Sequence, residues 1–109
     1  HVTSAMRFIR SNARRNIHVQ DVVDNSTLSI RALQQRFKKS LGKGIHQEIR
    51  RVRIRQFADR LLRTNLTVYQ IAHELEIDDI NHISRVFKRE MGSTPIEYRK
   101  KLSLPHQSY

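Results

Sequence analysis

Six polar side chains in two short stretches of the sequence have the chemistry needed to recognise nucleic-acid bases. They are Arg31, Gln34, Gln35, Asn81, His82 and Arg85. An arginine can donate two hydrogen bonds to guanine, and a glutamine or asparagine can pair in the same bidentate way with adenine. The alternative interpretation is an ordinary solvated helix face, although adjacent glutamines are less common there than lysine or glutamate.

A second group of residues is suited to contact phosphate rather than bases. Its members are Ser29, Lys38, Lys39, Lys88 and Arg89. Five arginines also lie between the two stretches, and they are Arg50, Arg51, Arg53, Arg55 and Arg60. For these five, two interpretations stay open: phosphate contact, or a solvated helix face on which Glu48 and Asp59 pair with neighbouring cations.

The overall charge favours a polyanionic partner. The chain of 109 residues has 21 Lys+Arg against 10 Asp+Glu, a net charge of +11, and a pI of about 11.1. A folded domain this basic typically binds nucleic acid. No apolar run approaches the ~20 residues of a membrane span, and no signal peptide is present. The first residue is not Met, so we expect a fragment or a processed chain.

Sequence features of enzymes and metal sites are missing. There is no cysteine, no glycine-rich phosphate loop and no H-E-x-x-H pattern. The six histidines are scattered along the chain, at His1, His18, His46, His73, His82 and His106. We therefore expect no catalytic residue, no metal and no cofactor, and we do not expect an enzyme.

The spacing of apolar residues predicts an all-α fold of seven helices. Apolar residues recur at intervals of three and four, and glycine and proline are few. We expect Asn16 to end the first helix in a left-handed conformation, and Ile30 and Leu41 to pack inward with Leu33 and Phe37. The expected helices cover residues 3–15, about 19–23, 29–41, 45–63, about 67–75, 79–91 and 95–102.

Capping residues mark several helix ends. Ser29 and Asp79 are expected N-caps, and glycines 42 and 92 are expected stops. The segments 67–70 and 94–97 have the Thr-x-x-Gln and Thr-x-x-Glu patterns of a capping box.

The two halves of the chain repeat one another at an offset of about 50 residues. Phe37 and Gly42 align with Phe87 and Gly92, and each half is a short helix, a turn and a longer helix. This is the helix-turn-helix plan, whose second helix enters the major groove of DNA. We expect a first such subdomain at 1–43, a linker helix at 44–65, a second subdomain at 66–102 and a frayed tail at 103–109.

The sequence resembles the DNA-binding domain of the AraC/XylS family of bacterial transcription regulators over roughly residues 5–101. The resemblance is carried by Ile71-Ala72 and by the segment 84–99, SRVFKREMGSTPIEYR, with Leu33 and residues 36–38 in the first half. Residues 6–13 and 45–49 are most similar to the xylose-operon activator subgroup. The resemblance implies two helix-turn-helix motifs joined by a long helix, regulation of promoters in the bacterial cytoplasm, and often activation through RNA polymerase. It also implies a separate effector-binding or dimerisation domain outside this chain.

The sequence departs from the family pattern at three places. The second turn has Glu76-Ile77 where the family commonly has glycine and an aromatic residue, so either a left-handed position is strained or the turn differs. His82-Ile83 replaces a common aromatic pair, which puts the base contact of His82 in doubt. The first turn, residues 25–28, lacks the frequent Met or Gly before Ser29.

Two other functions remain open at this point. One is a non-specific architectural binder that is held to nucleic acid by charge alone. The other is a basic helical bundle that binds an acidic protein. Gln34, Gln35 and Asn81 favour sequence-specific binding of double-stranded DNA, because a purely electrostatic binder needs only lysine and arginine.

Overall fold

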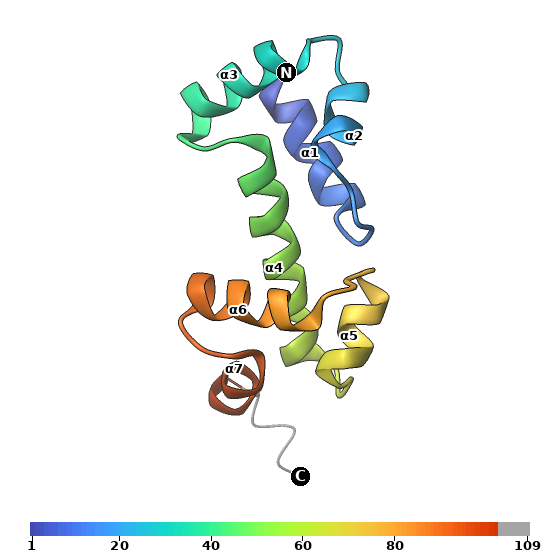
Figure 1. Cartoon of the computed structure of the whole chain (residues 1–109), viewed down its shortest axis with the longest axis vertical. Helices are drawn as coiled ribbons and strands as arrows, with labels where there is room; N and C mark the ends of the chain where they lie inside the picture. The colour runs from blue at the N-terminus through green and yellow to red at the C-terminus, as the bar shows by residue number, and fades with distance from the viewer. Residues whose placement is uncertain (103–109) are drawn as a thin grey trace. The chain divides into compact units, whose positions relative to one another are not determined.

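The computed structural model describes residues 1–102, and this part of the chain folds into seven α-helices without a strand (Figure 1). The expected all-α fold is therefore confirmed, and the tail at 103–109 lies outside the described residues. The helices are α1 (Val2–Asn12), α2 (Val19–Asp24), α3 (Ile30–Leu41), α4 (Ile45–Arg63), α5 (Val68–Glu74), α6 (Ile80–Met91) and α7 (Pro95–Leu102).

The chain forms two compact units, and each has its own hydrophobic core. The first unit, His1–Arg53, holds α1, α2, α3 and the beginning of α4, and the second starts at Ile54. Phe37 is fully buried in the first core, and Phe57 and Phe87 are fully buried in the second. The Phe87 ring also packs edge-on against Tyr98 from α7, with centroids 5.3 Å apart. Each unit is thus held together by apolar contacts of its own.

The helix ends follow the capping signals of the sequence. The Ser29 hydroxyl accepts a hydrogen bond from the Ala32 amide at 3.2 Å, and an Asp79 carboxylate oxygen accepts one from the His82 amide at 3.0 Å. Both expected capping boxes form, at residues 67–70 and 94–97. Gly42 and Gly92 end α3 and α6 in the left-handed conformation, which glycine adopts without steric cost.

Three details of the predicted helices are wrong. The first helix ends at Asn12 rather than Arg15, and Asn16 is not left-handed, since Glu76 is the one described non-glycine residue with a positive φ. Ile30 and Leu41, expected in the core, are 48% and 39% exposed. They lie at the first and last turns of α3, where the helix extends past the core that buries its middle.

An arginine joins the last helix of each unit to the end of its first helix, and it is buried in the first unit and half-buried in the second. Arg53 of α4 donates from Nη1 to the carbonyl oxygens of Ala13, at 2.7 Å, and of Arg15. In the second unit, Arg99 of α7 donates to the carbonyl oxygens of Leu61 and Thr64, at 2.9 and 3.2 Å. Carbonyls at a helix C-terminus have no partner within the helix, so a cation satisfies them and complements the helix dipole.

We predict that Arg53→Met destabilises the protein by about 2–4 kcal/mol, because it removes charged hydrogen bonds and takes from the Ala13 carbonyl its buried partner. Urea unfolding followed by circular dichroism measures this loss. Arg55→Met is the matched control, because Arg55 is exposed on the same helix. Equal losses in the two variants would show that Arg53 contributes only as part of the helix.

The turn between α5 and α6 places a non-glycine residue in the left-handed conformation. Glu76 has φ +56°, and the Ile77 amide donates to the Ala72 carbonyl at 2.8 Å while the Glu76 amide donates to the His73 carbonyl at 3.1 Å. These two bonds form a Schellman motif, whose left-handed position normally holds glycine. The sequence left open a strained left-handed position or a different turn, and the first of these is correct. The Glu76 side chain occupies a strained left-handed position.

We predict that Glu76→Gly raises the free energy of unfolding by about 0.5–1 kcal/mol, because glycine adopts this φ without strain. Thermal and urea denaturation measure the gain. Glu76→Ala removes the same carboxylate but keeps a Cβ, so it should give no such gain. A similar gain with alanine would mean that the charge of Glu76, not its backbone conformation, limits stability.

Candidate nucleic-acid interface

Each unit contains a helix-turn-helix motif, formed by α2 and α3 in the first and by α5 and α6 in the second. In both, the short helix ends in a tight turn, and an N-cap side chain begins the longer helix. The motif places the N-terminal part of its second helix against base edges. When such a motif binds DNA, the side chains on the outer face of its second helix meet the bases, and in this chain those helices are α3 and α6.

On α3, the side chains of Arg31 and Gln35 are exposed. Gln34 is different. Its Oε1 accepts a hydrogen bond from the Ile45 amide at 3.1 Å, at the first residue of α4, and an added Cβ on Gly44 would lie 3.2 Å from the same oxygen. Gln34 thus connects α3 to the start of α4, and its amide nitrogen is the group left for a base.

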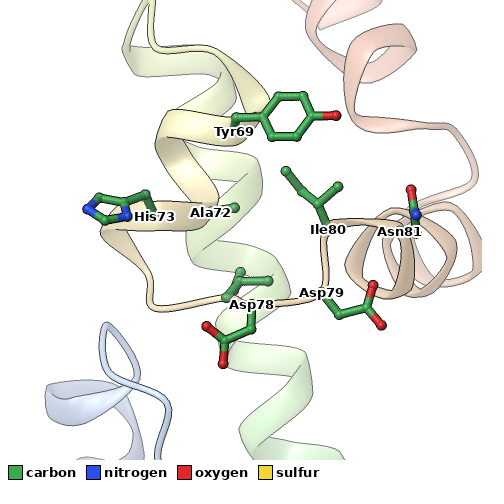
Figure 2. A pocket seen from close by; sticks show the side chains of 8 residues that line it. Tyr69, Ala72, His73, Asp78, Asp79, Ile80 and Asn81 are labelled. Carbon is green, nitrogen blue, oxygen red and sulfur yellow. The ribbon is translucent and has the colours of Figure 1, made fainter.

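On α6, the three side chains expected to read bases are all exposed, namely Asn81, His82 and Arg85. Asn81 follows Ile80 in α6 (Figure 2). Both residues line an open hollow of about 590 Å³ at the α5–α6 turn. The Tyr69 ring and Ile80 line the hollow together with the carboxylates of Asp78 and Asp79. Two carboxylates repel phosphate, so this hollow is not suited to a phosphate group.

The residues expected to contact phosphate are also at the surface. Lys38 and Lys39 near the end of α3, and Lys88 and Arg89 near the end of α6, are exposed. Ser29 is exposed too, but its hydroxyl already accepts the cap hydrogen bond described above. Ser29 still keeps its hydroxyl hydrogen as a donor to a phosphate oxygen.

The arginines of α4 have individual roles that their spacing in the sequence did not show. Arg53 is buried on backbone carbonyls, so it is unavailable to phosphate. Arg51 forms two hydrogen bonds with Glu48, at 2.9 and 2.7 Å, and Arg60 pairs with Glu74. Arg55 is exposed and Arg50 half-buried. Of the five, Arg55 keeps the solvent-facing position that phosphate contact requires.

The carboxyl groups whose pKa departs from the usual range serve structure rather than chemistry. Hydrogen bonding to Arg51 holds the pKa of the buried Glu48 below its usual value against the opposing effect of burial, and Lys43, 3.3 Å away, acts in the same direction. The capping hydrogen bonds from Thr94 lower the pKa of Glu97. Both carboxylates are thus stabilised in their charged form, which is opposite to what a general acid at neutral pH requires.

Neither a metal site nor a membrane-spanning helix is found in the described part of the chain. Within residues 1–102, no three His, Asp or Glu side chains gather where they could ligate an ion. None of the helices in that range combines the length and apolar character of a membrane span.

Known proteins share both the sequence and the fold of this chain. Residues 23–101 match a helix-turn-helix domain family. The xylose operon regulatory protein of Haemophilus influenzae is 35% identical over 98 residues, which cover 90% of this chain and 25% of that protein. The corresponding protein of Escherichia coli K12 is 32% identical over a segment of the same length. The chain therefore spans about a quarter of the length of these curated relatives.

Two solved structures extend the comparison. A xylose-binding transcription activator superposes with a TM-score of 0.86 at 31% identity, covering 94% of this chain and 27% of that one. The DNA-binding domain of the global transcription factor AdpA, solved with a target DNA, superposes with a TM-score of 0.83 at 19% identity. It covers 91% of this chain and 89% of that one. At 19% identity, the similarity to the AdpA domain is one of fold alone.

Proposed function

Since the chain belongs to the AraC-type family of helix-turn-helix DNA-binding transcription regulators, we propose that it recognises a specific sequence of double-stranded DNA with both of its motifs. In this proposal α3 and α6 enter successive major grooves. Arg31, Gln34 and Gln35 read bases from α3. Asn81, His82 and Arg85 read bases from α6.

The observation that carries this proposal is that polar side chains suited to bases lie on the second helix of both motifs, where Arg31 and Gln35 align with Asn81 and Arg85. Five of the six are exposed, and the sixth, Gln34, keeps its amide nitrogen as a donor. A binder that is held by charge alone needs no glutamine or asparagine there. One continuous helix, α4, links the two motifs, as is expected of a spacer between two recognition helices.

We further propose that the parent protein regulates promoters in the cytoplasm, and that it activates them through RNA polymerase. Two relatives are named as regulators of a xylose operon, and the structural relative at 31% identity is named as a xylose-binding activator. The chain covers about a quarter of each. This supports a further domain in the parent protein that binds an effector or dimerises.

We predict that Arg85→Ala and Gln35→Ala each relax the preference at one base position and cost about 1–3 kcal/mol of binding on the preferred duplex.

Lys38→Ala should weaken binding to all sequences alike, and should flatten the dependence of log K on log salt by about one unit. Fluorescence anisotropy on a duplex selected for tight binding, and on its single-base variants, measures both effects.

Lys38→Ala is the matched control for Gln35→Ala, because both residues are exposed on α3. If Arg85→Ala and Gln35→Ala weaken every duplex by the same factor, they do not read bases, and the chain is an electrostatic binder. An unchanged salt dependence in Lys38→Ala would remove Lys38 from the phosphate contacts.

A further inference from the structure

The two units have the same order of helices but very different net charge. Residues 1–53 contain twelve Lys+Arg against three Asp+Glu, a net charge of +9, whereas residues 54–109 contain nine against seven, a net charge of +2. These values account for the +11 of the whole chain. Both halves of the repeat therefore have the same order of helices, but most of the excess positive charge lies in the first half.

The difference is present in the segments that would enter DNA. Residues 28–42, which cap and form α3, include four basic residues and no acidic one. The equivalent residues 78–92 around α6 include three basic and three acidic residues. Among the three, Lys88 also lies close enough to Glu97 to lower the pKa of that carboxyl. The cations of α6 thus act among carboxylates that α3 lacks.

The first helix of each unit shows the same contrast. Arg7, Arg10 and Arg14 are exposed and lie within one stripe of α1 and its C-terminal turn. The carbonyls of Arg15 and Thr64 are bound in the same way by Arg53 and Arg99, so the two helices correspond at an offset of 49. At that offset, the residues equivalent to Arg7, Arg10 and Arg14 are Gln56, Asp59 and Arg63. There Arg63 pairs with Asp59 at 2.6 Å, so its charge is compensated.

From this contrast we propose that the two motifs contribute unequally to DNA binding. The first unit supplies most of the sequence-independent attraction to phosphate. The second engages DNA mainly through short-range contacts, once the first unit holds it. The physical reason is that attraction between exposed charges acts over about a Debye length, roughly 8–10 Å at working salt, and sums over all charges of one sign. This inference rests on the DNA binding proposed above, but not on its sequence specificity.

The test uses a random-sequence duplex of about 11 base pairs, one helical turn, which has room for one recognition helix. Lys38→Gln with Lys39→Gln is compared with Lys88→Gln with Arg89→Gln, the equivalent pair in the second unit. In about 0.1 M salt, the α3 pair should lose about tenfold or more in affinity, because each lost phosphate contact contributes several-fold. The α6 pair should lose several-fold less than the α3 pair, because the full chain binds this duplex mainly through its first unit.

Equal losses, or a larger loss from the α6 pair, would overturn the unequal division. Lys38→Arg with Lys39→Arg keeps both charges, so its affinity should stay within about twofold of wild type. A larger loss would show that the shape of the lysine side chains, not their charge, causes the loss in the α3 pair. Melting curves confirm that the variants fold. Because the duplex has no preferred sequence, the result stands apart from the specificity test: a chain without base preference can still show the asymmetry, and a specific one can lack it.

Discussion

In both units, an arginine side chain from the last helix reaches the carbonyl oxygens where the first helix ends. Arg53 binds the end of α1, and Arg99 binds the end of α4. Each contact ties together helices that lie far apart in the sequence, and it does so at the point where the chain leaves one helix for the helix-turn-helix motif. The apolar core fixes how the helices pack, and the arginine fixes where the motif begins. The orientation of α3 and α6 depends on both.

The helices were predictable because their signals are local. Caps at Ser29 and Asp79, the two capping boxes and the stops at Gly42 and Gly92 each involve residues within one turn of one another. The exposure of Ile30 and Leu41 was not predictable, because periodicity gives a helix face but not the length over which a core covers it. The buried role of Arg53 was also missed. Its partners are 38 to 40 residues away, and spacing alone makes it look like its exposed neighbour Arg55.

The candidate site was predictable to a similar degree. Residue type and helical spacing identified the outer faces of α3 and α6, and their exposure agrees with a role at a surface. The exception is Gln34, whose side-chain oxygen is held by the first amide of α4. A connection across eleven residues of sequence is invisible to helical periodicity, yet it links the recognition helix to the helix that follows. The unequal charge of the two units can be counted from the sequence, but only once the structure shows that the boundary between the units lies before Ile54.

Sequence-specific recognition by both motifs is tested by selecting preferred duplexes from a random library with the whole chain, at about 0.15 M salt. If two different recognition helices of one chain read two grooves, the selected motif is bipartite and non-palindromic, with two blocks about one helical turn apart. Enrichment of a single block would mean that one motif alone reads sequence. Recovery of bound DNA without any enriched motif would contradict sequence-specific recognition, and the six side chains proposed to read bases would then belong to an ordinary solvated surface.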